Sequence, residues 1–314
     1  MTTAKIIIYF GTSEMSALIL EKLLSHFKIK AVVTQPDRPS GRKQELTETP
    51  VKVIAKKHNL KILQPQKVSE ADFLDQLNNI NADLGILAAY AELIPNNIID
   101  MLPLGILNVH PSLLPKYRGA SPIQHAILNG DKITGVTIIR LVQKLDAGPI
   151  VAQKEYLISN EDTNITLHDK LAEVGAEILI EILPHYIDGT AQIIEQDESK
   201  MTMTKELGRD AGKIDWSKKA VEIERQFRAF QSWPGIFTHY DKKRLKIIDL
   251  SVFEGEIGAK LKNGEVFLGQ NNEVLIKCKE HAIHIKSLQM EGKKVMSAND
   301  FVNGYSDFVG SQLG

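Results

Sequence analysis

Short apolar runs alternate with helical patterns along the first half of the chain. Runs typical of buried strands span residues 5–10, 29–34, 60–63, 84–89, 106–110, 136–142 and 150–158. Leucine and isoleucine spacing predicts a helix over 15–27 and a long amphipathic helix over 163–186. Strands that alternate with helices in this way predict an α/β layer with a parallel sheet.

The pattern changes after residue 188, where polar sequence without clear periodicity begins. A helix is predicted at 220–230, and short strands separated by turns at 262–264 and 269–272 follow it. This spacing indicates a small β-barrel or sandwich. We therefore divide the chain into three parts, which are an α/β domain at 1–188, a linker at 189–207 and a C-terminal β domain at 208–314.

Composition limits the classes of function. A length of 314 residues is typical of about two domains, and a net charge of -1 argues against binding of polyanions through overall charge alone. One cysteine, Cys278, excludes an internal disulfide and a cysteine-rich zinc site. The apolar run Ile6–Phe10 is too short for a signal sequence or a membrane span, so we expect a cytoplasmic protein.

Three common motifs are absent from the sequence. It lacks the glycine-rich dinucleotide fingerprint, the lysine-containing phosphate loop and the His-Glu-x-x-His zinc motif. These absences disfavour an NAD enzyme, a nucleotide hydrolase and a zinc hydrolase.

Candidate chemistry lies at the end of the strand predicted at 106–110. Pro111 ends that strand because proline cannot donate to a sheet. Side chains two positions apart share a face, so Asn108 and His110 project together from the strand end where open parallel sheets bind ligands. Asp146 adds a carboxylate downstream. An oxyanion donor, a proton carrier and a carboxylate are the groups needed to move an acyl group.

Four stretches of the sequence match a known family. They are Thr34–Arg42, which contains Gln-Pro-Asp-Arg-Pro, the block Leu107–Gln124, the pair Lys213–Trp216 and Arg228–Gly235, and Glu291–Ala298. With Asp146 they resemble the folate-dependent formyltransferases, and within them the branch that acts on methionyl-tRNA. The block around His110 is shared with glycinamide ribonucleotide transformylase and sugar formyltransferases, whereas the other stretches favour the tRNA branch.

The resemblance implies a fold and an activity. The fold is a Rossmann-like parallel-sheet domain followed by a small OB-like β-barrel that helps to hold tRNA. The activity is transfer of the formyl group of 10-formyltetrahydrofolate to the α-amine of methionyl initiator tRNA. We expect Asn108 and His110 to stabilise the tetrahedral oxyanion, His110 also to carry a proton, and Asp146 to orient or charge-stabilise His110 or to hold a relaying water.

The resemblance also implies binding residues. The folate pocket is expected to include Tyr90, Ala91, Ser112, Leu113, Leu114, Pro115 and Val142. Contacts to tRNA are expected from Arg38, Arg42 and Lys43 in a long loop after a strand, and from the basic residues Lys242, Lys243 and Arg244 in a hairpin. Two departures from the family pattern stand out: Ala91 replaces the usual glycine, and the loop after Arg42 is less basic.

Two other functions remain open. The first is another 10-formyltetrahydrofolate enzyme, either an amino-sugar formyltransferase or a hydrolase, which would share Asn108, His110 and Asp146 but not need the basic C-terminal barrel. The second is a catalytically inactive tRNA- or folate-binding homologue. Neither metal nor membrane is indicated, and we expect a monomer.

Overall fold

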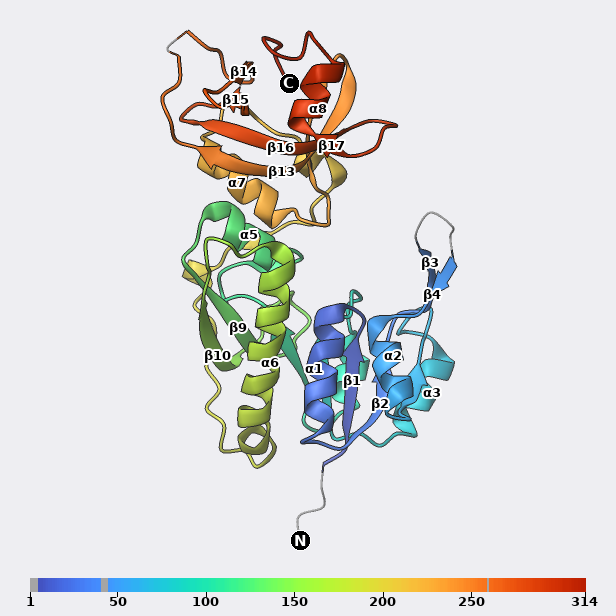
Figure 1. Cartoon of the computed structure of the whole chain (residues 1–314). Coiled ribbons are helices and arrows are strands. Elements are labelled where there is room, and N and C mark those ends of the chain that lie inside the picture. Colours follow the sequence, from blue (N-terminus) through green and yellow to red (C-terminus); the bar gives the residue numbers. More distant parts are fainter. Residues whose placement is uncertain (1–4, 41–44, 259) are drawn as a thin grey trace. The chain divides into compact units, whose positions relative to one another are not determined.

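The computed structural model describes residues 5–40, 45–258 and 260–314, which form two compact units (Figure 1). The first unit contains the chain up to Pro122 together with Lys132–Ile158 and Thr166–Lys205. The second unit contains Ile123–Asp131, Ser159–Ile165 and Glu206–Gly314. Two short segments that come before residue 166 thus belong to the unit that contains the C-terminus.

A seven-stranded sheet is the centre of the first unit. Its strands are, in spatial order, β10 (Ile150–Leu157), β9 (Ile133–Arg140), β7 (Ile106–His110), β6 (Leu84–Ala88), β1 (Ile7–Gly11), β2 (Ile29–Val33) and β5 (Lys61–Leu63). The five strands from β7 to β5 are parallel, which confirms the predicted sheet. β9 and β10 add antiparallel pairs at one edge.

Local sequence sets where the helices of this unit begin. The Ser13 hydroxyl accepts the amide of Ser16 at the start of α1 (Glu14–Leu24). The Thr49 hydroxyl likewise caps α2 (Pro50–Lys57), whose first residue is a proline. Such caps satisfy amides that have no partner inside the helix. The other helices from this half of the chain are α3 (Ala71–Asn78), α4 (Asn96–Asp100), α5 (Pro122–Asn129) and α6 (Asn164–Ile187).

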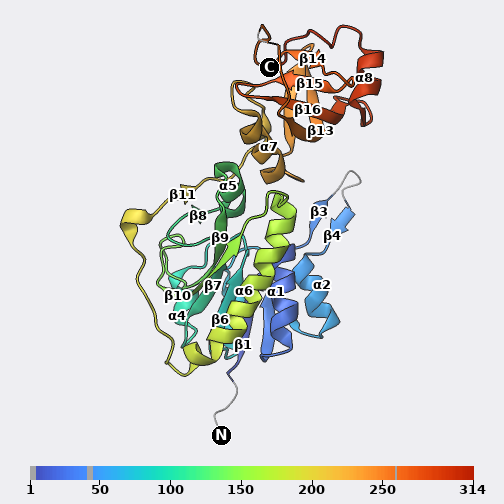
Figure 2. The ribbon, with the colours of Figure 1, turned by 60° about the vertical axis from the view of Figure 1, so that its left-hand side comes forward.

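Helices cover both faces of the sheet. On one face, Phe73 of α3 and Ile98 of α4 join a buried cluster with Ile8 and Ile106 of the strands. On the other, α1 and α6 lie side by side (Figures 1 and 2). Gly175 lets α6 approach closely, since a Cβ there would lie 2.9 Å from a methyl group of Val109. Strands buried on both faces are apolar along their length, so polar side chains gather at strand ends.

The stretch expected as a linker packs onto the first unit instead. Within it, β11 (Met203–Thr204) pairs with β8 (Arg118–Gly119), and a 3-10 turn, η1, spans Glu198–Lys200. Residues as far as Lys205 belong to the first unit. These residues contact the rest of the first unit through backbone and polar groups rather than through an apolar face. Hydrophobic periodicity therefore does not detect this packing. A separate hairpin is made by β3 (Arg38–Ser40) and β4 (Glu45–Thr47).

A curled antiparallel sheet forms the second unit, which confirms the small β domain as an open half-barrel. The strands follow the path β12 (Ile236–Tyr240), β13 (Lys243–Phe253), β16 (Ala282–Met290), β15 (Val274–Lys277) and β14 (Val266–Leu268), with β17 (Met296–Ser297) paired to β16. The remaining helices are η2 (Arg209–Gly212), α7 (Ala220–Ala229) and α8 (Ala298–Gly304). Asp241 and Lys242 both take positive φ in the two-residue turn that joins β12 to β13.

The two tryptophans have different environments. Trp216 is buried and donates its indole N–H to the Thr238 hydroxyl at 3.0 Å. Trp233 is 52% exposed, and Arg209 lies over its ring. Trp216 therefore anchors the core of the second unit, whereas Trp233 contributes to its surface.

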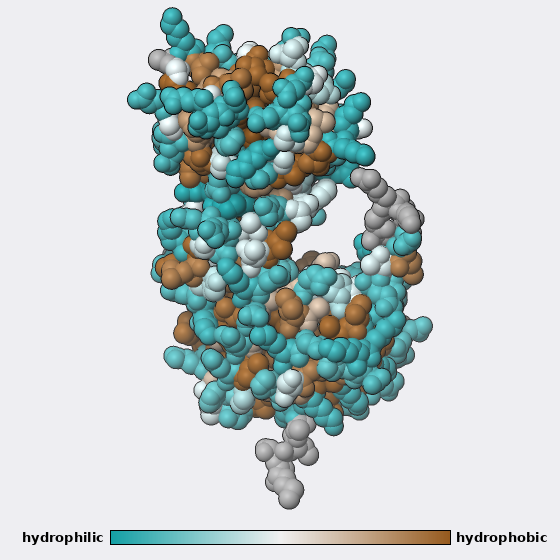
Figure 3. Space-filling model, viewed as in Figure 1, coloured by the Kyte–Doolittle hydropathy of each residue, from teal (hydrophilic) through white to brown (hydrophobic). Residues whose placement is uncertain are grey.

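Hydrophilic residues cover most of the surface visible in Figure 3, with hydrophobic ones in small patches. Within the described part of the chain, no helix is both long and apolar enough to cross a membrane.

We expect Trp216→Phe to lower the free energy of unfolding by about 1–3 kcal/mol, because the buried Thr238 hydroxyl loses its donor. Urea denaturation followed by circular dichroism measures this loss. Trp233→Phe is the matched control and should change stability by less than about 0.5 kcal/mol, because that side chain is half exposed. Equal losses of stability from the two substitutions would contradict the conclusion that Trp216 anchors the core of the second unit and Trp233 does not.

Candidate active site

The three residues expected to act together do meet in the structure. Asn108 and His110 occupy alternate positions of β7 at its carboxyl end, and both are buried, with 6% and 4% exposure. The Asn108 amide donates to Oδ1 of Asp146 at 3.4 Å. His110 Nδ1 lies 3.6 Å from Oδ2 of the same carboxylate. Asp146 thus bridges an amide and an imidazole at one strand end.

A backbone carbonyl selects the tautomer of His110. The Nε2 atom lies 2.9 Å from the carbonyl oxygen of Tyr117. A carbonyl only accepts hydrogen bonds, so Nε2 is the nitrogen that carries the proton. Nδ1, next to Asp146, is therefore the nitrogen that can take up and release a proton. The Asn108 amide has two hydrogens, and within the described residues only one of them has a partner, the Asp146 carboxylate.

The loop that presents Asp146 is held by several polar contacts. Asp146 takes a φ of 47°, and its Oδ2 accepts the amide of Gly119 at 2.8 Å. Gln196 donates to the carbonyl oxygens of Asp146 and Gly148 at 2.8 and 2.7 Å. Gly148 has no room for a side chain, since a Cβ there would lie 1.8 Å from the Arg140 carbonyl oxygen. The carboxylate is therefore fixed in position before any ligand binds.

Sequence reasoning missed the supporting residues of this site. Arg118 is 1% exposed and donates to Gln196 Oε1 through Nε and Nη2, at 3.1 and 2.7 Å. Gln196 lies in the stretch expected as a linker, so neither periodicity nor spacing indicated it. The Tyr117 carbonyl and the Gly119 amide are backbone groups, which have no sequence signature. Only the match over Leu107–Gln124 marked their neighbourhood.

The loop after β6 has an unusual backbone. Ala89 and Ala91 take φ values of 45° and 67°, a region that favours glycine. Tyr90 between them is 1% exposed, and its hydroxyl has no partner among the described residues. Burial raises the pKa of the Tyr90 phenol, so this group remains a hydrogen-bond donor at neutral pH. Ala91 therefore occupies a conformation that suits the glycine usual in the family.

The other positions expected to hold folate differ in accessibility. Ser112 is fully buried, and its hydroxyl donates to the Lys116 carbonyl at 2.6 Å. Leu114 is buried as well, whereas Leu113, Pro115 and Val142 are half-buried. Side-chain contact with a ligand is open to the last three, while Ser112 and Leu114 support the turn from inside.

The residues expected to contact tRNA fall into three groups. Arg38 is exposed at the start of the β3–β4 hairpin. Arg42 and Lys43 lie outside the described residues. Lys242 is exposed on the turn between β12 and β13 and Lys243 is exposed at the start of β13, whereas the Arg244 guanidinium lies 3.5 Å from the centre of the Phe237 ring. Arg244 thus packs against the sheet of the second unit, unlike the two lysines.

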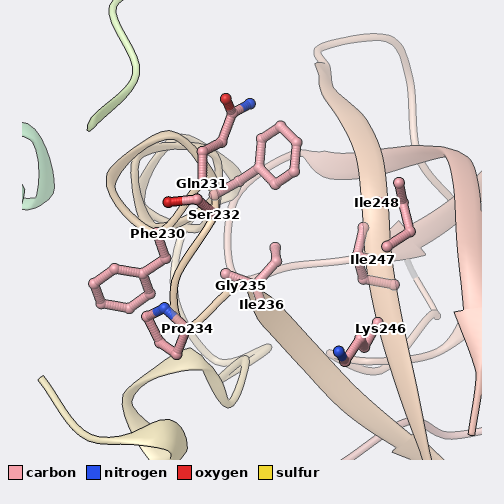
Figure 4. Close-up of a pocket in the computed structure, with 10 residues that line it drawn as sticks. Phe230, Gln231, Ser232, Pro234, Gly235, Ile236, Lys246, Ile247 and Ile248 are labelled. Carbon is pink, nitrogen blue, oxygen red and sulfur yellow. The ribbon is translucent and has the colours of Figure 1, made fainter. Parts of the chain in front are cut away.

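A pocket of about 310 Å³ lies within the second unit (Figure 4). Apolar walls come from Phe230, Pro234 and Ile248, and Gln231 and Lys246 add polar groups. The sequence marked this region only through its Trp-Pro-Gly turn. Among the described residues, no group of three or more histidine, cysteine, aspartate or glutamate side chains could hold a metal ion.

Two family models match the chain. One, described as formyl transferase, covers residues 4–183, and the other, described as formyl transferase, C-terminal domain, covers residues 206–306.

Similar proteins from bacteria match over nearly the whole chain. A methionyl-tRNA formyltransferase from Caldicellulosiruptor saccharolyticus is 41% identical over 302 residues, 95% of this chain and 96% of that relative. A methionyl-tRNA formyltransferase from Staphylococcus epidermidis is 39% identical over 309 residues, 98% of this chain and 99% of that relative.

Solved structures with lower identity share the fold. WlaRD, a sugar 3N-formyl transferase crystallised in the presence of dTDP and 5-N-formyl-THF, has a TM-score of 0.65 at 23% identity, over 93% of this chain and 99% of that one. HypX from Aquifex aeolicus has a TM-score of 0.65 at 17% identity, over 98% of this chain but 50% of that one. This chain therefore spans half the length of HypX.

We expect Ala91→Gly to raise the free energy of unfolding by about 1 kcal/mol, because it relieves a left-handed alanine. Thermal and urea denaturation measure the gain. Ala71→Gly, in the exposed first turn of α3, is the matched control and should instead cost up to about 1 kcal/mol. The same sign for both substitutions would show that Ala91 is not strained.

Proposed function

The chain belongs to the formyl transferase family, and we propose that its two substrates are 10-formyltetrahydrofolate and methionyl initiator tRNA. Relatives 39–41% identical over 95–98% of the chain are methionyl-tRNA formyltransferases, and formylation of methionyl-tRNA is the activity of this chain. A folate co-substrate agrees with the family and with HypX, which has been crystallised with tetrahydrofolic acid. The more specific proposals, which are 10-formyltetrahydrofolate as formyl donor, initiator tRNA as acceptor and the roles of individual residues, are argued below.

The observation that carries the proposal is the arrangement of Asn108, His110 and Asp146. The Asn108 amide and the His110 imidazole stand on one strand end, and one carboxylate lies 3.4 Å from the Asn108 amide and 3.6 Å from His110 Nδ1. This set supplies an oxyanion donor and a proton carrier with a charge partner, which formyl transfer requires.

The reaction begins with the unprotonated α-amine of the methionyl group. Its lone pair attacks the formyl carbon, and the carbonyl electrons move to the oxygen, which becomes negative. The free hydrogen of the Asn108 amide stabilises that oxygen, and His110 adds to this only after Nδ1 has taken up a proton, because its Nε2–H is held by the Tyr117 carbonyl. Such donors act strongly in a site that is already organised and shielded from water.

Breakdown of the intermediate needs a proton transfer. His110 Nδ1 takes the proton from the attacking nitrogen, and the resulting imidazolium is stabilised by the Asp146 carboxylate at 3.6 Å. The bond between the formyl carbon and N10 of the folate then breaks, and the proton passes to N10. The products are N-formylmethionyl-tRNA and tetrahydrofolate, and His110 returns to its starting tautomer.

Folate binding is proposed for the loop Tyr90–Ala91 and the half-buried Leu113, Pro115 and Val142 beside the same strand ends. In open α/β sheets, ligands bind outside the carboxyl ends of the strands. Ser112 and Leu114 shape this pocket through the turn that they support.

Contact with tRNA is proposed for Arg38, Arg42 and Lys43 of the first unit and for Lys242 and Lys243 of the second. The formal net charge of the chain is only -1, so attraction to phosphate depends on local groups of exposed cations. We further propose that the protein acts as a cytoplasmic monomer.

The experiment that tests this function uses the purified chain with 10-formyltetrahydrofolate and methionine-charged tRNA. Initiator and elongator tRNA are assayed in parallel, and formylmethionyl-tRNA is measured. Formylation of the initiator alone is expected. Transfer to a nucleotide-linked amino sugar, or folate binding without any transfer, would overturn the proposal.

We expect Asn108→Ala to lower kcat about 10²–10³-fold, because one oxyanion donor is lost. Initial rates at saturating concentrations of both substrates measure the effect. Asn78→Ala, an exposed asparagine at the end of α3, is the control and should retain full activity. Near-normal turnover of Asn108→Ala would remove this residue from the mechanism.

We expect the double variant Lys242→Gln, Lys243→Gln to raise KM for tRNA with little change in kcat. Each lost phosphate contact should reduce the slope of log KM against log salt concentration by about 1. Lys219→Gln is the control, since Lys219 is paired with Glu280 at 2.9 Å in the same unit. An unchanged salt slope in the double variant would exclude the turn from the tRNA contact.

A further inference from the structure

The chain segment 188–205, between α6 and the second unit, contacts the loops that carry the residues of the candidate active site. Its residues Gln196, Glu198, Thr202 and Thr204 make hydrogen bonds to the loops around the catalytic group. This segment is the polar stretch in which no function was expected.

Gln196 is the residue of this segment that donates a hydrogen bond directly to Asp146. It is 9% exposed, and both of its Nε2 hydrogens are used, one on the Asp146 carbonyl and one on the Gly148 carbonyl. These two carbonyls flank the tight turn in which Asp146 takes positive φ. Gln196 thereby joins the two sides of the turn that presents the carboxylate.

Gln196 is itself held in one orientation. Its Oε1 accepts two hydrogen bonds from the buried Arg118 guanidinium, so its amide cannot flip without losing both. Arg118 also pairs with Glu198 at 2.8 Å, and Lys144 pairs with the other oxygen of that carboxylate at 2.8 Å. Arg118 and then Lys144 lower the pKa of Glu198 to about 2, so the network keeps its charges at neutral pH.

Thr202 acts on the other partner of His110. Its hydroxyl accepts the amide of Tyr117 at 2.8 Å, and its own carbonyl accepts the amide of Arg118 at 2.9 Å. Tyr117 takes a φ of 63° between these contacts, and its carbonyl is the one that receives Nε2–H of His110. One segment thus fixes the carbonyl on one side of the imidazole and the carboxylate on the other.

We infer that Gln196 and Thr202 are positioning residues for formyl transfer, which set the placement of Asp146 and the tautomer of His110. This inference rests on the proposed catalytic roles of His110 and Asp146. Neither residue needs to touch a substrate. Their effect should therefore fall on kcat rather than on the KM of either substrate.

The first test is Gln196→Glu, which keeps an acceptor for Arg118 but removes both donors to the loop. We expect kcat for formylmethionyl-tRNA to fall about 10–100-fold, as expected for a displacement of about 1 Å in a catalytic group. Both KM values should stay within about threefold. The circular dichroism spectrum should remain that of the folded wild type, because the pair with Arg118 is retained, while the melting temperature falls because two carbonyls lose their donors. A folded variant with wild-type kcat overturns the role of Gln196.

The second test is Thr202→Val, which removes the hydroxyl that accepts the Tyr117 amide but keeps the volume of the side chain and buries no charge, because Thr202 is an exposed residue. We expect kcat to fall about tenfold. The ¹⁵N spectrum of the His110 ring should change from protonated Nε2 alone towards a mixture of tautomers. An unchanged ring spectrum together with an unchanged kcat overturns the role of Thr202.

Gln226→Glu is the matched control. Gln226 is 8% exposed in the second unit and donates to the carbonyls of Ala211 and Lys213 at 2.8 and 3.2 Å, so it loses the same kind of contact. Its kcat should stay within about twofold of the wild type, and an equal fall would assign the Gln196 effect to general loosening. Wild-type turnover in the same assay tests the proposed function separately, since an active wild type with unaffected variants overturns only the positioning role.

Discussion

The hydrogen bond from His110 Nε2 to the Tyr117 carbonyl is the contact on which the site depends. It fixes the protonated nitrogen at 2.9 Å from a group that can only accept, and so leaves Nδ1 beside Asp146. With the opposite tautomer, Nε2 would face the carbonyl with a lone pair, and Nδ1 could not take up a proton. In the proposed mechanism, formyl transfer thus depends on a backbone oxygen that takes no part in the chemistry itself.

Because this arrangement is buried, each of its polar groups needs a hydrogen-bond partner from the protein. Asn108, His110 and Arg118 are each less than 7% exposed, and a buried polar group without a partner costs stability. The polar segment around Gln196 and Thr202 satisfies many of these groups and holds the loops that carry them. A hydrophobic segment could cover the same surface, but it could not supply two donors to the carbonyls around Asp146. The segment around Gln196 is therefore polar because the loop carbonyls beside it need hydrogen-bond donors.

The two units place their candidate functional residues on different kinds of local structure. The first unit builds its site on the ends of strands buried on both faces, where the backbone is rigid. The second unit presents exposed lysines in and just after a two-residue turn, where we propose that their long side chains contact the phosphate backbone of tRNA. Arg244, next to them in sequence, instead packs on Phe237. Neighbouring cations of one basic run thus differ, since the two lysines are free to contact the proposed tRNA whereas Arg244 packs on a ring of its own unit.

The sequence by itself determined the parallel sheet and the shared face of Asn108 and His110. These features are local, since they follow from hydrophobic periodicity and the alternation of a strand. Only the tertiary structure determined that Tyr117 supplies the carbonyl, that Gln196 holds the Asp146 turn and that the expected linker belongs to the first unit. Every residue has a carbonyl, and a polar stretch has no period, so such contacts depend on the path of the chain and leave no pattern in its sequence.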